Sequence, residues 1–195
     1  MKDISLQMVR DSGLTLDWQT VCVGWRGFPL YPYYDDERLL SEEVRDFAYE
    51  SLEYAVDSEY QQALVNLIDA NTNGGFSDVM ARYGEALAEL SGIPRELAVR
   101  KWRYATLQEC MNETLSKVSA YGEYHSYASV GYCAYILVRQ WNVTLSADAV
   151  PEVEPGYLDK AAFLLGSEAL RSWLSQEKQL LTELGQMVEP LAPLV

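Results

Sequence analysis

The sequence has few of the side chains that most enzymes and metal sites use. Its 195 residues include a single histidine, His125, and only three cysteines, which stand far apart at positions 22, 110 and 133. A structural zinc site needs about four Cys or His ligands at close spacing, and a Ser–His pair needs its histidine beside the nucleophile. No Walker loop, G-x-G-x-x-G or G-x-S-x-G motif occurs. We therefore expect no metal, no cofactor and no catalytic residue.

Long apolar runs are also missing. The longest nearly apolar run, Ala128–Val138, has eleven residues, whereas a transmembrane helix needs about 20. The first residues, MKDISLQMVRDSG, contain no apolar segment of the kind found in signal peptides. Scattered cysteines provide no disulfide framework, which is typical of a reducing compartment. These observations predict a cytoplasmic protein without membrane contact.

Basic residues are scarce. Fifteen Lys and Arg stand against 29 Asp and Glu, so the net charge is -14 and the pI is near 4.4. This balance disfavours direct binding to nucleic-acid phosphates or to an anionic membrane, and it favours a basic protein partner. One basic cluster, Arg95, Arg100, Lys101 and Arg103, is either an anion site or a set of cations that pair with acids of the same chain.

The acids concentrate in one stretch, Asp35–Glu59. It holds ten carboxylates and two arginines, a net charge of -8 in 25 residues. At about 100° per residue, the stretch after Ser41 forms a helix with one buried and one acidic face. The predicted buried face consists of Val44, Phe47, Ala48, Leu52 and Ala55. The predicted acidic face consists of Glu42, Glu43, Asp46, Glu50, Glu53 and Asp57, with Tyr49 and Tyr54 at its edges.

The acidic face has two interpretations. It is either a solvated surface that aids solubility or a docking surface for a basic partner. Like charges four residues apart each cost roughly 0.2–0.5 kcal/mol, so the helix accepts a small penalty for a face of a single sign. The predicted partner-binding residues are Tyr33, Tyr34, Asp35, Asp36, Glu42, Asp46, Tyr49, Glu50, Glu53, Tyr54 and Asp57.

Helical periodicity recurs along most of the chain and predicts an all-α fold. We expect a single domain of about seven helices in antiparallel hairpins, because short turns separate successive periodic segments. Residues 1–13 and 189–195 are expected at the periphery. Helices are predicted near 17–25, 41–57, 58–70, 77–90, 94–120, 121–141, 157–165 and 167–188.

Two local resemblances bear on function. The segment Tyr31-Pro32-Tyr33-Tyr34-Asp35-Asp36-Glu37, followed by an acidic helix, resembles the surface by which bacterial immunity proteins block nuclease toxins. Leu16-Asp17-Trp18, Leu40-Ser41-Glu42-Glu43 and Lys101-Trp102 resemble segments of larger helical proteins encoded beside polymorphic toxins. Both resemblances imply a non-enzymatic immunity protein or antitoxin that occludes a basic toxin, expected to be a nuclease.

Two other classes of function remain open. One is an acidic helical chaperone or a mimic of nucleic-acid charge, which would need acids over a larger surface. The other is an enzyme with a carboxylate site or with a site at His125, because carboxylates are plentiful. A deep pocket with strongly shifted titratable groups would favour the enzyme.

Overall fold

The structure of the chain is a computed structural model. It describes residues 4–27, 38–55, 57–70, 75–121, 134–143, 149–153 and 160–187.

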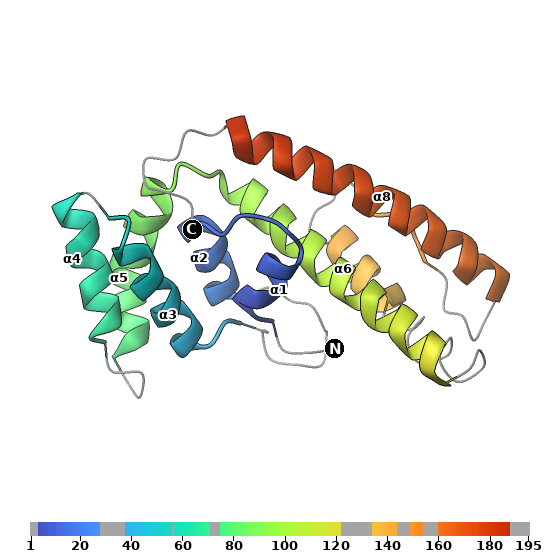
Figure 1. Cartoon of the computed structure of the whole chain (residues 1–195), viewed down its shortest axis with the longest axis horizontal. Helices are drawn as coiled ribbons and strands as arrows, with labels where there is room; N and C mark the ends of the chain where they lie inside the picture. The colour runs from blue at the N-terminus through green and yellow to red at the C-terminus, as the bar shows by residue number, and fades with distance from the viewer. Residues whose placement is uncertain are drawn as a thin grey trace. The chain divides into compact units, whose positions relative to one another are not determined.

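The fold is all-α, as the sequence predicts, and the described residues contain no strand. The helices are α1 (Leu6–Asp11), α2 (Trp18–Arg26), α3 (Ser41–Leu52), α4 (Ser58–Ile68), α5 (Phe76–Leu90), α6 (Arg95–Tyr121) and α8 (Lys160–Met187), with a further helical segment at 134–143 (Figure 1).

Contacts group the chain into two compact units. Among the described residues, the N-terminal unit holds 4–27, 38–102 and the end of α8 from Leu181, and the C-terminal unit holds 103–180. The boundaries fall inside α6 and α8, so the units are not consecutive domains along the sequence. Each unit is described by itself below.

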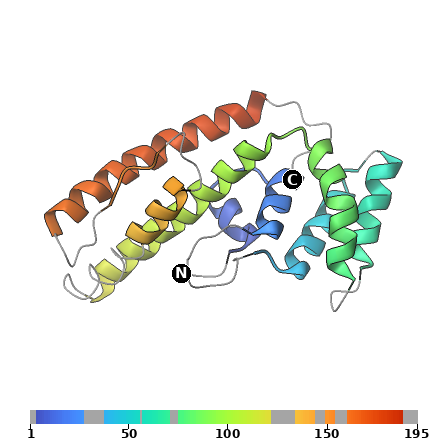
Figure 2. The same cartoon turned by 180° about the vertical axis from the view of Figure 1, so that it is seen from behind.

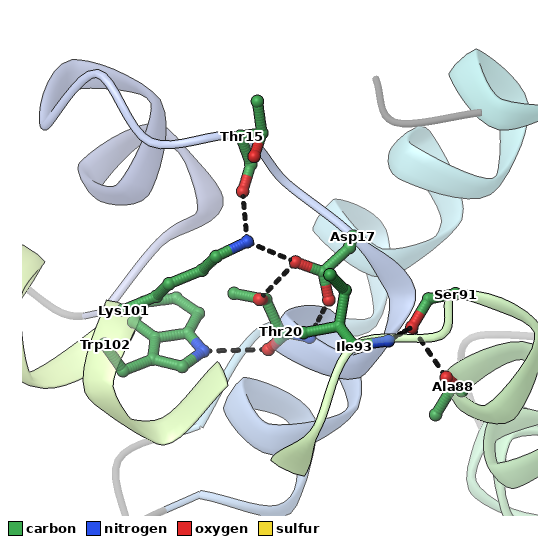
Figure 3. Close-up of polar contacts among 8 residues, drawn as sticks. All are labelled: Thr15, Asp17, Thr20, Ala88, Ser91, Ile93, Lys101 and Trp102. Atoms are coloured by element: carbon green, nitrogen blue, oxygen red, sulfur yellow. Dashed lines mark hydrogen bonds and ion pairs between the residues drawn. The ribbon is translucent and has the colours of Figure 1, made fainter. Parts of the chain in front are cut away.

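In the N-terminal unit, helices α3, α4 and α5 run alternately up and down as antiparallel hairpins (Figure 1). Helix α2 packs against α5, where the rings of Trp25 and Phe76 meet edge to face with centroids 5.3 Å apart. Helix α5 ends at Leu90, and the hydroxyl of its C-cap residue, Ser91, donates to the Ala88 carbonyl at 2.6 Å (Figure 3). The predicted arrangement in hairpins is confirmed here.

Helix α2 begins and packs through two specific residues. Asp17 is its N-cap, and its carboxylate accepts the backbone N–H of Thr20 at 2.8 Å, which satisfies a donor of the first turn. Gly24 lies against α6 so closely that an added Cβ would sit 2.5 Å from Trp102 Cζ2 and 2.8 Å from Leu39 Cδ1. The absence of a side chain at Gly24 therefore sets the distance between α2 and α6.

Several helix limits differ from the prediction. The acidic helix ends at Leu52 rather than near Asp57, because Asp57 instead caps α4 and accepts the backbone N–H of Glu59 at 2.8 Å. Helix α1 was not predicted, yet it buries Leu6 and Val9. Helix α8 continues through Gly166, where two separate helices were expected.

The C-terminal unit contains the second part of α6, the helical segment 134–143 and most of α8, which lie side by side (Figures 1 and 2). Trp141 Nε1 donates to Thr106 Oγ1 at 3.0 Å, which joins the segment 134–143 to α6. Arg103 Nη2 donates to Glu177 Oε1 at 3.0 Å, which joins α6 to α8. The core of this unit is thus crossed by polar contacts between large buried side chains.

Candidate binding surface

Helix α3 carries a straight row of exposed acidic and aromatic side chains along one side. Glu42, Asp46, Tyr49 and Glu53 fall within about 60° of one another around the helix axis, and all four are exposed. Glu53 is the C-cap and still has helical backbone angles, φ -61 and ψ -29. We call these four residues the α3 stripe.

The α3 stripe points directly away from the protein core. The buried residues of α3 are Val44, Phe47, Ala48 and Ser51, and their mean direction lies about 180° from that of the stripe. Tyr49 is 69% exposed at the middle of the stripe. A large aromatic side chain at this point contributes little to the packing of α3, so most of its surface is open to contact with a partner.

The opposite face of α3 is held firmly. Phe47 meets the Trp18 indole edge to face, with ring centroids 5.0 Å apart. Trp18 Nε1 in turn donates to the Tyr60 hydroxyl at 3.0 Å. These contacts join α3 to α2 and α4 through buried side chains, so the stripe stands on a rigid base.

Glu43, the neighbour of the first stripe residue, has an internal role. Its Oε1 accepts the backbone N–H of Leu6 at 3.1 Å, and its Oε2 accepts the backbone N–H of Leu40 at 3.4 Å. These two amides lie at the first turns of α1 and α3, where backbone donors have no partner within the helix. One carboxylate therefore caps two helices.

Two of the predicted partner-binding acids also have intramolecular contacts. Glu50 forms an ion pair with Arg10 of α1, and Asp57 is the N-cap of α4. A partner would have to compete with these contacts for either carboxylate. By contrast, no ion pair joins Glu42, Asp46 or Glu53 to a cation among the described residues.

The remaining predicted residues are divided. Tyr54 follows the stripe in the sequence and is 48% exposed, and Leu40, which is not among the predicted residues, precedes it and is 63% exposed. The positions Tyr33, Tyr34, Asp35 and Asp36 lie outside the described residues.

Two of the four residues of the basic cluster on α6, Lys101 and Arg103, are buried, while Arg95 is exposed and Arg100 is half-buried. Lys101 Nζ lies 2.6 Å from Asp17 Oδ2 and donates to the Thr15 carbonyl at 2.9 Å, while Thr20 Oγ1 donates to Asp17 Oδ2 at 2.8 Å (Figure 3). Next to this pair, Trp102 Nε1 donates to the Thr20 carbonyl at 2.8 Å. The interpretation that cations of this cluster pair with acids of the chain is confirmed for Lys101.

Arg103 has the same kind of environment in the C-terminal unit. Its guanidinium pairs with Glu177 and lies 4.9 Å from the centre of the Trp173 ring. Both charged side chains are buried, so the Arg103 guanidinium is not available to an external anion.

Titratable side chains line two hollows among the described residues. A hollow of about 360 Å³ in the N-terminal unit is lined in part by Cys22, Arg26 and Glu85. Burial raises the pKa of the Cys22 thiol to about 12, which keeps it protonated and a poor nucleophile at neutral pH. His125 lies outside the described residues.

A second hollow, of about 490 Å³, lies in the C-terminal unit between the helical segment 134–143 and the residues around Val153. Arg139 and Glu152 line it, but both are exposed on its rim. Within the described ranges, no three His, Cys, Asp or Glu side chains gather as metal ligands. None of the helices described is both long and apolar enough to span a bilayer.

No protein-family model, curated protein or solved structure matches this chain. The proposal of a function therefore depends on the chain's own surface chemistry.

Proposed function

We propose that this chain is a non-enzymatic inhibitor, an immunity protein or antitoxin that occludes a basic toxin, with a nuclease as the expected target. The observation that carries the proposal is the α3 stripe. Three carboxylates that form no ion pair within the described part of the chain, and a tyrosine that is 69% exposed, stand on a helix whose other side is packed into the core. A rigid surface of this kind binds with little loss of conformational entropy.

Charge and aromatic area supply different parts of the binding free energy. The carboxylates Glu42, Asp46 and Glu53 steer a basic partner toward α3, and such steering raises association rates by about 10- to 1000-fold. Tyr49 and Tyr54 supply contact area, because tyrosine is enriched among interface residues that carry most of the affinity. The sign and the aromatic content of the surface together favour a basic protein.

A mimic of nucleic-acid charge is less well supported. The α3 stripe is about 16 Å long, because Glu42 and Glu53 are eleven steps of 1.5 Å apart. This length corresponds to about five base-pair steps of DNA at 3.4 Å each. Tyr49, at its centre, has no counterpart in a phosphate backbone. The stripe therefore fits one side of a protein interface better than a DNA decoy.

The test begins with capture of the partner. The tagged full chain is expressed in its native host, and the proteins that co-purify are identified at low salt and at about 0.5 M salt, where charges are strongly screened. We expect one basic protein, retained at low salt and weakened at high salt. The absence of any stoichiometric partner at both salt concentrations would contradict the proposal.

Charge reversal then locates the interface. The variants Asp46→Lys and Glu53→Lys should slow association with the captured partner by about 10-fold or more and reduce its salt dependence. Glu89→Lys is the matched control, because Glu89 is exposed on α5 away from the stripe. If Asp46→Lys left affinity and salt dependence unchanged, the acidic face would be only a solubility feature.

A further inference from the structure

The order of residues in the α3 stripe is regular. Glu42, Asp46, Tyr49 and Glu53 follow one another at intervals of four, three and four residues. Every lengthwise row of residues on an α-helix has this spacing, which keeps the four side chains on one line. A second helix laid along α3 can therefore contact all four side chains in turn.

The spacing of side chains on an extended strand matches the α3 stripe less well. Alternate residues of a strand lie about 6.7 Å apart, so four of them span about 20 Å, whereas the α3 stripe spans about 16 Å. The side chains would be out of register by roughly 4 Å at the fourth contact. A helix repeats the same rise as α3 and keeps every contact in register.

Tyr49, the third side chain of the stripe, adds apolar contact area and is 69% exposed. Leu40 and Tyr54 precede and follow the stripe in the sequence, but at about 100° per residue they lie well to one side of its line. An approaching helix can place the aliphatic stem of a Lys or Arg beside the Tyr49 ring while its charged ends reach the carboxylates. Charge and apolar area along this line therefore both favour a basic helix.

We infer that the α3 stripe docks a basic α-helix of the partner, with Lys or Arg at i, i+4 and i+11 and a small residue at i+7 facing Tyr49. This inference rests on the proposed function, since it specifies the partner element that the same surface receives. Glu43 and Glu50 take no part, because they hold α1 through Leu6 and Arg10.

The probe is a synthetic, end-capped peptide of Ala and Gln with lysines at i, i+4 and i+11 and alanine at i+7. Its isomer has the same composition, with the lysines spread around the helix. Both are titrated with the full chain at low salt, and binding is followed by fluorescence anisotropy and by the gain of helical circular dichroism. We expect the striped peptide to bind about 10-fold more tightly than its isomer and to gain helicity.

Variants of the chain locate the binding of the peptide. Asp46→Lys should abolish the difference between the two peptides, and Glu89→Lys should preserve it. Asp46→Asn removes the charge with a smaller change of shape and should weaken the striped peptide in the same direction. Circular dichroism of each variant confirms that the chain itself is folded.

The outcomes separate this inference from the proposed function. Equal binding of the two peptides, or no detectable binding of the striped peptide, would overturn the helix inference, while capture of a basic partner would still support the inhibitor. Preferential binding of the striped peptide, combined with no basic protein captured from the host, would retain the docking geometry and contradict the proposed function.

Discussion

Lys101 and Asp17, which are 84 positions apart, form an ion pair of 2.6 Å in which each side chain is only 1% exposed. Both charges have given up most of their hydration, so each depends on the other for compensation. The pair also fixes α2, because Asp17 is the N-cap of that helix. The Asp17 carboxylate therefore both caps α2 and pairs with Lys101 of α6.

Removal of the cation should be strongly destabilising. In Lys101→Met the Asp17 carboxylate stays buried without its partner, and we expect the free energy of unfolding to fall by about 3–5 kcal/mol, measured by urea unfolding. The control Arg26→Met breaks a pair with Glu85 whose side chains are 50% and 74% exposed, and should change stability by less than about 1 kcal/mol. Similar small effects for both variants would contradict the structural role of Lys101.

Adjacent glutamates should separate stability from binding. Glu43→Gln replaces one acceptor oxygen with a donor that faces a backbone N–H, and should lower the free energy of unfolding by about 1–2 kcal/mol. Glu42→Gln, one position earlier on the α3 stripe, should leave stability nearly unchanged and weaken the captured partner. Thermal unfolding and titration with the partner check both variants. A loss of stability in Glu42→Gln, together with weaker partner binding in a stable Glu43→Gln, would contradict the two roles.

Reversing the central charge of the stripe should stabilise the isolated chain. Asp46 stands four residues from both Glu42 and Glu50, so Asp46→Lys replaces two like-charge pairs with two opposite-charge pairs. Each repulsion removed and each attraction gained contributes roughly 0.2–0.5 kcal/mol, so we expect a gain of about 1–2 kcal/mol at low salt, measured by denaturant unfolding. A loss of stability would mean that Asp46 makes a favourable contact in the free chain.

Alkaline pH should weaken the fold through Cys22. Its thiol donates to the Gly84 carbonyl at 3.1 Å, and burial raises its pKa from 9.0 to about 12. The unfolded chain therefore loses this proton first, and the free energy of unfolding falls as the pH rises from about 9 to 12, by at most about 1.4 kcal/mol per pH unit.

The contribution of Cys22 can be isolated by substitution. Burial also raises the pKa values of Tyr60 and Tyr104, so part of the alkaline loss remains in Cys22→Ala. We expect this variant to show a shallower fall of unfolding free energy between about pH 9 and pH 11 than the unmodified chain. Parallel curves for the two proteins would show that the thiol titrates normally in the folded state.

Two glycines of α8 should respond in opposite ways to alanine. An added Cβ at Gly166 would lie 2.9 Å from the Glu152 carbonyl oxygen and 3.1 Å from Val153 Cα. A Cβ at Gly185 would have no described atom within 4 Å apart from its chain neighbours and the nearby backbone of α8 itself. Gly166→Ala should cost about 1–3 kcal/mol, and Gly185→Ala should gain up to about 1 kcal/mol from helix propensity. Denaturant unfolding of both variants compares them within one helix.

Much of the fold follows from local sequence. The 3.6-residue spacing of Val44, Phe47 and Ala48 correctly predicts the buried face of α3, and Asp17 correctly predicts the start of α2. Periodicity could not show that Asp57 caps α4, because an acid at the end of an acidic run has the same pattern whether it continues one helix or begins the next.

The spacing of residues along α3 could not predict which acids contact distant segments of the chain and which do not. Glu43 binds the amide of Leu6, which is 37 positions away, and Glu50 binds Arg10, which is 40 positions away. Helical periodicity reports which side of a helix a residue occupies, but not which distant segment covers part of that side. Helix α1 itself escaped prediction because only six residues form it.

The contacts of α6 have a consequence for the order of folding. Trp102 reaches the carbonyl of Thr20 across 82 positions, and Lys101 reaches Asp17 across 84. Closing such long loops has a high entropic cost and slows folding. During synthesis, α2 reaches its final environment only after α6 has left the ribosome. In a nascent chain that ends before Arg95, the Asp17 carboxylate stays hydrated and the Thr20 carbonyl lacks its Trp102 donor.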